Sequence, residues 1–305
     1  MIDWAAIRVA ALGARNDAAL PPRISFPVLP RTLTEFCRKA EDPKVTQREL
    51  ATLIENDTGL CCELLRYVNC AQVGLRNKAS SAQHALALLG IRKTKLFLMS
   101  AGMKMALAAR SSKLINLKNF WNANLERALF AKEVAILLRA DADLAFVGGM
   151  LQDFLLPILT NELTDDYLSF IGDQERKPQD LPVFEKTRFG WDHAFAAAHL
   201  LSAWNFPDDL TCCLMFHHRG LAMLCDKQLG KTAVAAVAVA GLLPDAMKQS
   251  PQGLEHLLKL EKFWPDFHLE EIATRVHEQF EATAPGVKHD FSLLHIYQRM
   301  TAVAS

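Results

Sequence analysis

Apolar residues in this 305-residue chain recur with the 3.6-residue period of an α-helix almost from end to end, and the strict alternation typical of β-strands is nearly absent. One apolar face consists of Cys61, Leu64, Leu65 and Val68. A second consists of Ala82, Ala85, Leu86 and Leu89. We expect Gly90 to end that helix with a left-handed residue. The pattern predicts an all-α protein, a multi-helical bundle of a dozen or more helices.

Side chains that can cap helices mark several expected helix starts. Thr46, with Glu49 three residues later, matches a capping box, and Ser80 with Gln83 offers another. Asp57 can cap the helix that carries the first apolar face, because a carboxylate accepts hydrogen bonds from the free N–H groups of a first turn. These signals support the helical interpretation independently of the apolar pattern.

Longer apolar segments predict the remaining helices, which cover residues 91–108, 120–138, 144–159, 181–189, 193–204, 208–218, 233–243 and 269–280. Pro157 can kink or shorten the helix over 144–159, because proline lacks a backbone N–H. The charged segment 173–180 predicts an exposed loop. Burial is expected for Leu64, Leu65, Val68, Leu89 and Leu151.

The charge balance argues against a nucleic-acid partner. Lys+Arg and Asp+Glu both number 34, which gives a formal net charge of zero, and half of the residues are apolar. A dedicated nucleic-acid coat or a polybasic membrane anchor needs an excess of positive charge. We therefore expect a chain that buries a sizeable core and binds neither nucleic acid nor a membrane surface.

Neither a membrane span nor a disulfide framework is expected. The longest uninterrupted apolar stretch, residues 233–243, is far shorter than the ~20 residues that a span needs. Residues 1–4 lack the basic start of a signal peptide. The seven cysteines include two adjacent pairs and no C-x-x-C spacing, so they fit neither disulfides nor a zinc site. We expect mostly buried thiols in a reducing, cytoplasmic compartment.

Two blocks of motifs follow one another along the chain. The first contains residues 26–30 (FPVLP), 54–57 (IEND), 64–71 (LLRYVNCA), 80–81 (SS) and 85–90 (ALALLG). The second contains residues 148–153 (GGMLQD), 190–194 (GWDHA), 204–207 (WNFP) and 217–218 (HH). In order, spacing and residue types the two blocks resemble the HDOD family, bacterial signalling proteins related to the HD-type metal-dependent phosphohydrolases.

The resemblance covers about residues 22–222 and predicts the domain organisation. The polar residues 109–113 separate two helical lobes of the HDOD-like domain, about 22–108 and 117–222. In the family such lobes pack together. Residues 1–21 are expected to form an N-terminal helical extension, and residues 223–305 an additional C-terminal helical region.

The resemblance also implies where metal ligands would lie. HD relatives hold one or two divalent metals with a His, a His-Asp pair and a later Asp, and use a metal-bound hydroxide on a phosphoester. The corresponding positions here are Ala123, the pair Gln152 and Asp153, and Gly241, and no nearby His or Asp restores the missing ligands. One carboxylate out of four ligands binds a catalytic metal poorly. We therefore expect a degenerate site with no metal, no cofactor and no phosphohydrolase activity.

Asp153, His193, His217 and His218 are the ionisable residues left at such a site. Ordinary structural roles explain them: Asp153 as a paired buried acid, His193 as a capping or core residue, and the other two as helix-end imidazoles favoured by the helix dipole. The alternatives are a remnant ligand or pH-sensing role for His193. An adventitious or structural metal on Asp153, His193 and His217 also stays open.

Asn69, Arg92 and Lys93 are further candidates for binding. Asn69 lies where a helix yields to a loop, so its amide is expected to bond the backbone of the following turn, with ligand recognition as the alternative. Arg92 and Lys93 belong to a local group of cations that also contains Arg76, Lys78 and Lys95. Such a group usually forms a solvated face, and a site for phosphate or an acidic partner is the alternative.

Three functions remain open. The first is a non-catalytic regulatory module that transmits a signal through protein contacts, on a surface beside or between its lobes. The alternative is a divergent metal-dependent phosphohydrolase acting on a nucleotide or cyclic dinucleotide. A nucleotide- or nucleic-acid-binding module around Arg92 is the third, and the neutral net charge and lack of interleaved aromatic residues count against it.

Overall fold

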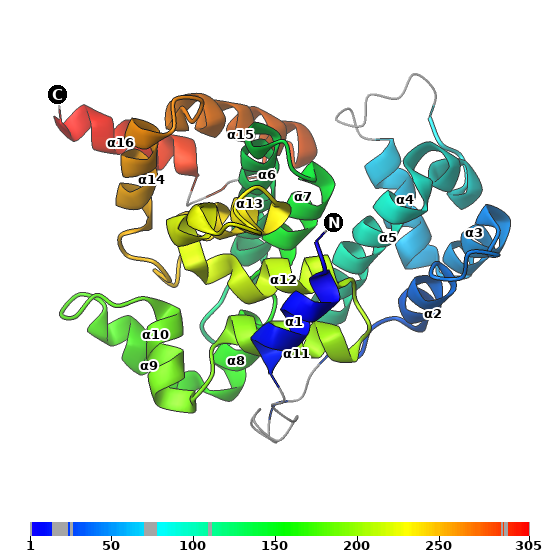
Figure 1. Ribbon diagram of the computed structural model, residues 1–305, viewed down its shortest axis with the longest axis horizontal. Coiled ribbons are helices and arrows are strands. Elements are labelled where there is room, and N and C mark those ends of the chain that lie inside the picture. The colour runs from blue at the N-terminus through cyan, green and yellow to red at the C-terminus, as the bar shows by residue number, and fades with distance from the viewer. Residues whose placement is uncertain are drawn as a thin grey trace. The chain divides into compact units, whose positions relative to one another are not determined.

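The computed structural model describes residues 2–13, 24, 27–69, 78–108, 112–287, 289 and 292–304. Over these residues every regular element is a helix and no β-strand is present, so the all-α prediction is confirmed (Figure 1). By its internal contacts the chain divides into two compact units. One contains residues 26–110, and the other contains residues 1–25 together with 111–305.

The smaller unit contains α2 (Arg31–Lys39), α3 (Gln47–Glu55), α4 (Thr58–Val68) and α5 (Ala82–Ala108), and α5 packs against the other three. The predicted capping box opens α3. The Thr46 hydroxyl accepts a hydrogen bond from the Glu49 N–H at 3.2 Å, and the Glu49 carboxylate accepts one from the Thr46 N–H at 2.9 Å. Asp57 caps α4 by accepting from the Leu60 N–H. Both predicted helix starts are confirmed.

The predicted start of α5 is wrong by one residue. Ser81, rather than Ser80, caps this helix by accepting a hydrogen bond from the His84 N–H at 3.1 Å. The helix begins at Ala82, so a cap at Ser80 would lie one residue too early to reach the free N–H groups. Gly90 interrupts α5 with a φ of 77°, which confirms the break expected there.

Burial in the smaller unit follows the predicted apolar faces at their centres but not at their edges. Leu64 and Val68 are fully buried, as predicted. Leu65 and Leu89 are only partly buried, which corrects the expectation for both. Both leucines lie at the edge of a predicted apolar face. They are less buried than its centre because the buried stripe of a surface helix is narrower than the set of apolar residues along it.

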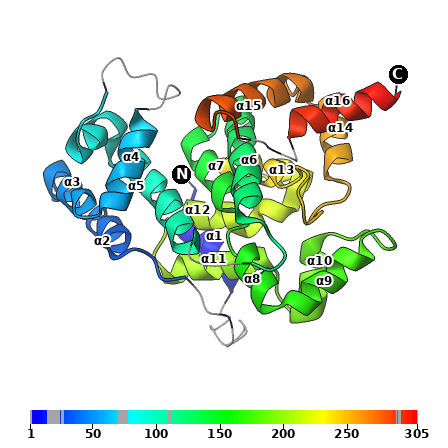
Figure 2. The ribbon, with the colours of Figure 1, turned by 180° about the vertical axis from the view of Figure 1, so that it is seen from behind.

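The larger unit has an entirely apolar helix at its centre. Its helices are α1 (Trp4–Leu12), α6 (Leu117–Leu138), α7 (Ala142–Leu151), α8 (Leu156–Glu162), α9 (Thr164–Asp173), α10 (Leu181–Phe189), α11 (His193–Ala203), α12 (Asp208–Phe216), the 3-10 helix η3 (His217–Cys225), α13 (Ala233–Ala240), α14 (Gly253–Phe263), α15 (Leu269–Thr283) and α16 (Leu293–Ala304). Every residue of α13 is buried, and α13 contacts α6, α7, α12 and η3 (Figure 2). A helix that is apolar all round can only be a core helix.

Two adjacent glycines allow α7 to approach its neighbours closely. A Cβ at Gly148 would lie 2.8 Å from Val237 of α13, and a Cβ at Gly149 would lie 2.9 Å from the Cα of Ala128 on α6. The helix α7 could therefore not lie this close to α13 and α6 if residues 148 and 149 carried side chains. This packing fixes the C-terminal end of α7, where the functional candidates begin.

The helix expected over residues 144–159 is two helices. Residues 152–155 form a turn between α7 and α8, with Pro157 in the first turn of α8, where its missing N–H costs nothing. Residues 142–162 are long and apolar enough to cross a membrane by length and composition, but 78% of the apolar window is buried inside the protein. The interruption and the burial identify this segment as part of the core.

The C-terminal helices belong to the larger unit and are tied to α6 by buried polar contacts. Glu133 on α6 accepts hydrogen bonds from the Arg275 Nε at 2.8 Å and the Gln279 Nε2 at 2.7 Å, both on α15. Glu126, two turns earlier on the same face of α6, accepts from the Leu293 N–H at the start of α16 at 2.8 Å. Residues 223–305 therefore share one packed unit with residues 112–222.

The remaining sequence predictions need two corrections. The segment 173–180 is exposed as predicted except at Gln174, which is buried, and Gln179, which is partly buried. The Gln174 side chain bonds both backbone groups of Gln179. The cysteines are less uniformly buried than expected. Cys37, Cys212 and Cys213 are buried, Cys61 is half-buried, and Cys62 and Cys225 are exposed. Cys70 lies outside the described residues.

A candidate metal centre

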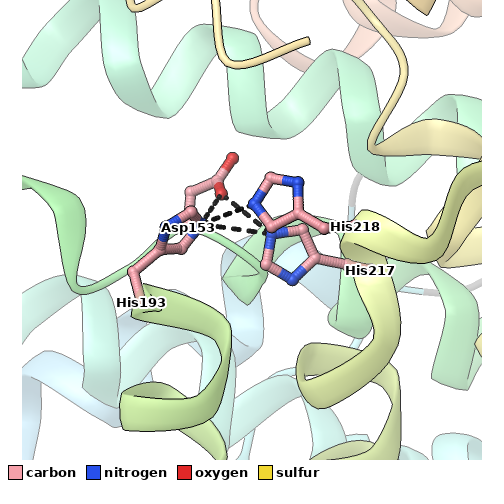
Figure 3. Close-up of side chains that lie close together, drawn as sticks. All are labelled: Asp153, His193, His217 and His218. Carbon is pink, nitrogen blue, oxygen red and sulfur yellow. Dashed lines mark hydrogen bonds and ion pairs between the residues drawn. The ribbon is translucent and has the colours of Figure 1, made fainter. Parts of the chain in front are cut away.

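Four potential metal ligands converge inside the larger unit (Figure 3). Asp153 lies in the turn between α7 and α8, and His193 is the first residue of α11. His217 and His218 lie where α12 gives way to η3. Asp153, His193 and His217 are fully buried, whereas His218 is partly exposed. One ligand atom from each residue lies within 4.8 Å of all the others.

The shortest separations join the Nε2 atoms of the imidazoles and one oxygen of Asp153. His193 Nε2 and His217 Nε2 each lie 3.3 Å from Asp153 Oδ1 and 3.3 Å from one another. His218 Nε2 lies 2.8 Å from His193 Nε2. Asp153 Oδ1 accepts no hydrogen bond of acceptable geometry. A buried carboxylate oxygen therefore faces a group of ring nitrogens that do not satisfy it.

The opposite edges of two imidazoles are held by hydrogen bonds. His193 Nδ1 donates to the Glu185 Oε2 at 2.7 Å, and the His193 backbone N–H donates to the same oxygen at 2.9 Å. Tyr167 donates its hydroxyl to the other oxygen of Glu185 at 2.6 Å. His217 Nδ1 donates to the Leu214 carbonyl at 2.7 Å. These bonds orient both rings so that Nε2 points to the centre of the cluster.

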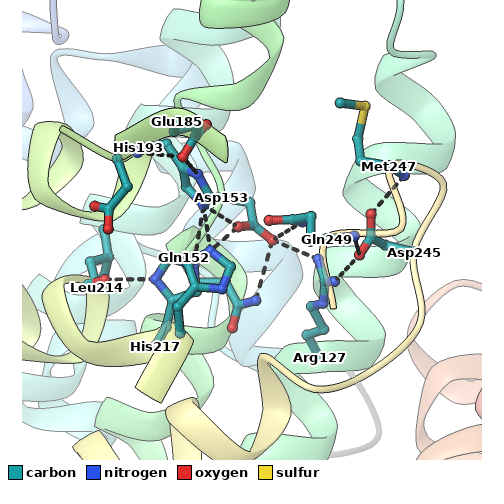
Figure 4. A network of polar contacts seen from close by, with 12 residues as sticks. Arg127, Gln152, Asp153, Glu185, His193, Leu214, His217, Asp245, Met247 and Gln249 are labelled. Carbon is teal, nitrogen blue, oxygen red and sulfur yellow. Dashed lines mark hydrogen bonds and ion pairs between the residues drawn. The ribbon is translucent and has the colours of Figure 1, made fainter. Parts of the chain in front are cut away.

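The second oxygen of Asp153 belongs to a different network (Figure 4). Asp153 Oδ2 accepts hydrogen bonds from the Arg127 Nη1 at 2.6 Å, and from the Nε2 amides of Gln152 and Gln249 at 3.2 Å each. Arg127 Nη2 also donates to Asp245 Oδ2 at 2.9 Å. All of these side chains are buried. Asp153 therefore has one oxygen bound to a guanidinium and one directed at the imidazoles.

The charges of this network shift several pKa values. Burial favours the neutral form of Asp153, but Arg127 and the imidazoles outweigh it and hold its pKa well below the ordinary range. Burial opposes a charge on His193 too, yet the carboxylates of Glu185 and Asp153 raise its pKa to about 10. Burial, followed by repulsion from His217 and His193, lowers the pKa of His218 well below 6.5.

The positions that the resemblance marks for ligands lack them. Ala123 is one helical turn before Arg127 on α6, so the two share a face of the helix, and the guanidinium reaches Asp153 where a ligand at Ala123 is missing. Gln152 donates its amide to Asp153 and offers no metal ligand there. Gly241 packs against the backbone at the start of η3, since a Cβ there would lie 2.5 Å from the His217 carbonyl oxygen.

The expectation that no acid lies near position 241 needs correction. Asp245, four residues further along, comes to the site from the segment after α13. It binds Arg127 and the backbone N–H groups of Met247 and Gln249, rather than facing the imidazoles. A terminal carboxylate is thus present but is neutralised by an arginine.

A two-metal phosphohydrolase centre does not fit these residues. Such a centre needs a carboxylate that can serve both ions, as well as ligands on each side of it. Here three donors already occupy Asp153 Oδ2, and one of them is a cation. Only the side of Asp153 Oδ1 offers further ligands, so at most one ion can be held.

Sequence reasoning found four residues of the cluster but missed those that orient and neutralise it. Arg127, Glu185, Asp245, Gln249 and Tyr167 were not among the candidates. Glu185 does carry a signal, because it lies four residues after Leu181 on the apolar face of α10, where a buried acid must have a partner.

The remaining candidates lie in the smaller unit. Asn69 donates its amide to the Ala79 carbonyl at 2.9 Å and accepts from the Ala79 N–H at 2.7 Å, the backbone-tethering contact that the sequence analysis favours. Arg92 is exposed and Lys93 is half-buried on α5, while Lys95 pairs with Glu41. Arg76 lies outside the described residues.

Comparison with known proteins identifies the family from the sequence. The family model of the HDOD domain matches residues 26–220. An uncharacterised protein from Treponema pallidum is 26% identical over 204 residues, which are 66% of this chain and only 39% of that protein. The chain thus spans about two fifths of the length of this relative.

Solved structures share the fold at low identity. An HDOD domain protein of unknown function from Geobacter sulfurreducens superposes with a TM-score of 0.60 and 16% identity, over 98% of this chain and 96% of that one. A candidate phosphohydrolase from Shewanella amazonensis gives a TM-score of 0.60 and 19% identity, over 90% and 91% of the two chains. Such identities establish the fold and leave the activity to be argued from the site.

Proposed function

Since this chain belongs to the HDOD family of signalling-related, HD-like proteins, we propose that it is a non-catalytic regulatory module that acts through contacts with another protein. The observation that carries the proposal is the pairing of Arg127 with Asp153. Arg127 donates to the carboxylate oxygen of Asp153 that a second metal would need. It also donates to Asp245, the acid nearest in sequence to the expected terminal ligand position.

The chemistry of phosphoester hydrolysis supports this proposal. A metal-bound hydroxide forms when one or two ions with open coordination positions lower the pKa of water. Ala123, Gln152 and Gly241 supply no anionic or imidazole ligand, and Arg127 adds a positive charge beside the one carboxylate that faces the cluster. The shortage of ligands and the added positive charge both argue against a two-metal reaction at this site.

A direct assay separates this proposal from the alternative, a divergent phosphohydrolase acting on a nucleotide or cyclic dinucleotide. The purified protein is incubated with bis-p-nitrophenyl phosphate and with cyclic dinucleotides, in manganese, iron(II) or zinc. We expect no turnover above that of the Asp153→Ala variant. Metal-dependent turnover that disappears in Asp153→Ala would establish the hydrolase instead, because a contaminating enzyme would survive the substitution.

The partner surface that we propose is the basic part of α5. Arg92 is exposed there, beside the half-buried Lys93, and cations of this kind raise the association rate with an acidic partner. A cytoplasmic location suits this role, and the free thiols of the six described cysteines are consistent with a reducing compartment.

The surface is tested by charge reversal with a matched control. Arg92→Glu with Lys93→Glu should slow association with a partner captured from the native host, and the effect should shrink at high salt. Lys44→Glu with Arg48→Glu makes the same change in charge at exposed positions of the same unit, next to α3 and within it. Equal association rates for the two double variants would remove α5 from the proposed interface.

A further inference from the structure

We propose that Asp153, His193, His217 and His218 bind a single transition-metal ion, zinc in particular, in a site that is closed to hydrolytic water. This inference goes beyond the regulatory function proposed above and does not depend on it. It assigns the cluster a structural ion, which the sequence leaves only as an open alternative to a site without metal.

The first argument is a count of hydrogens. Because His193 and His217 each donate from Nδ1, to Glu185 and to the Leu214 carbonyl, their neutral rings carry no hydrogen on Nε2. Asp153 Oδ1 also has no hydrogen to share, and it accepts none. His218 Nε2, 2.8 Å from His193 Nε2, can donate a hydrogen to only one of these three lone pairs. At least two lone pairs therefore meet unsatisfied in a buried space, which is unfavourable unless a cation lies among them.

A proton is the other cation that could lie there. One extra proton on His193 Nε2 can point at Asp153 Oδ1 or at His218 Nε2, which lies 2.8 Å away. Either choice leaves His217 Nε2 facing Asp153 Oδ1 at 3.3 Å with no hydrogen between them. A single metal ion satisfies all of these atoms at once.

The second argument is the geometry of the cluster. Ligands bound at about 2.0 Å to a tetrahedral zinc lie about 3.3 Å from one another. Asp153 Oδ1, His193 Nε2 and His217 Nε2 form a triangle whose three sides are each 3.3 Å. This triangle matches one face of the tetrahedron. His218 Nε2, on a partly exposed ring, is within 4.8 Å of the other three atoms and completes the set with a small movement.

The surrounding residues have the arrangement that supports histidine ligands. A metal-bound imidazole usually donates its other N–H to a carboxylate or a backbone carbonyl, which fixes the ring and strengthens the ligand. Glu185 does this for His193 and is itself held by the Tyr167 hydroxyl, while the Leu214 carbonyl does it for His217. Figure 4 shows these supporting bonds around the cluster.

The ligand types select the metal. Three imidazoles and one carboxylate suit zinc and neighbouring transition metals, whereas magnesium and calcium prefer oxygen ligands throughout. Four protein ligands fill a tetrahedral zinc and leave no position for a reactive water, as in structural zinc sites. Bound zinc would join the end of α7, the start of α11 and the end of α12, and so stabilise the larger unit.

The experiment measures metal binding without reference to activity. The protein is stripped with a chelator, titrated with zinc, and loaded with cobalt(II), whose tetrahedral complexes absorb strongly in the visible range. We expect one zinc per chain, a tetrahedral cobalt spectrum and a higher melting temperature with zinc. Zinc affinity should fall at least tenfold in His218→Gln, and about 10- to 100-fold in Glu185→Gln, which changes only the support of a ligand.

The control is His256→Gln, which changes a half-buried histidine of α14 outside the cluster and should bind zinc as the unaltered protein does. His218 is partly exposed, so its variant is expected to fold, and circular dichroism checks this. The proposal is overturned if His218→Gln and His256→Gln bind zinc equally well, or if cobalt gives only the weak spectrum of a hydrated ion. Neither result would alter the hydrolysis assay above, so the two proposals can fail separately.

Discussion

Replacing Arg127 with methionine should remove a large part of the stability of the larger unit. Arg127 is 3% exposed and donates to Asp153, Asp245 and the Leu243 carbonyl. Methionine keeps most of the aliphatic volume and removes the positive charge. Asp153 and Asp245 would then be two buried carboxylates with no cation between them.

The expected loss follows from the burial of this network. Removing one partner of a buried ion pair typically costs about 3–5 kcal/mol, because the other charge is left without compensation. A protein with about 5–15 kcal/mol of total stability would lose roughly a fifth or more of it. Burial already raises the pKa of Asp245 despite Arg127, so this carboxylate should take up a proton more readily in Arg127→Met. A folded variant with a protonated Asp245 binds more protons than its unfolded state. The stability lost in Arg127→Met should therefore be smaller at low pH and grow as the pH rises.

Urea unfolding followed by tryptophan fluorescence measures this loss in the relevant unit. All of the tryptophans, Trp4, Trp121, Trp191, Trp204 and Trp264, lie in the larger unit. Arg188→Met is the control, since Arg188 also bonds an aspartate at 2.6 Å but is 62% exposed, and such pairs contribute about 1 kcal/mol or less. Adding Asp245→Asn to Arg127→Met should restore part of the loss. Equal effects of Arg127→Met and Arg188→Met would refute the reasoning.

Three further predictions concern packing, tethering and thiols. Gly241→Ala should lower the free energy of unfolding by about 1–3 kcal/mol because the new Cβ meets the His217 carbonyl, although the φ of −61° suits any residue. In the control Gly172→Ala on α9 the new Cβ meets nothing, so the change should be neutral or stabilising. Equal melting temperatures of the two variants would contradict this. Asn69→Ala should expose the Ala79 amide to faster hydrogen exchange, since both amide bonds are lost. Maleimide at neutral pH should modify Cys62 and Cys225 before Cys37 and Cys212, whose pKa values burial raises to about 11 and about 12; early labelling of Cys212 would argue against its burial.

The fold could be predicted from the sequence because its signals are local. Thr46 and Glu49 meet within one turn, and the cap at Asp57 needs no distant residue. The errors are local as well. Ser81 replaces Ser80 as a cap, and the turn at 152–155 divides a segment whose apolar residues continue on both sides of Gln152 and Asp153. Apolar periodicity shows that a segment is buried and helical, but it cannot locate a break inside a segment that is buried on all sides.

The site could be predicted only in part, because its residues come from distant segments. The sequence indicates Asp153, His193, His217 and His218 one by one, within a resemblance that ends near residue 222. Asp245 and Gln249 lie beyond that limit, so nothing in the sequence linked them to Asp153. The helix dipole is enough to explain histidines at 217 and 218 in the sequence, and only the folded chain brings their nitrogens within reach of His193.

Arg127 explains how one oxygen of a buried aspartate is satisfied in a site that lacks the usual ligands. A buried carboxylate needs cations or hydrogen-bond donors on both oxygens. In a two-metal hydrolase the ions supply this charge, whereas in this chain Arg127 and two amides satisfy Oδ2, and Oδ1 is left to the imidazoles. Restoring the missing ligands at positions 123 and 152 would therefore not restore a two-metal site, because Arg127 would still hold Oδ2. Only their combination with Arg127→Ala would free both oxygens of Asp153 for metal.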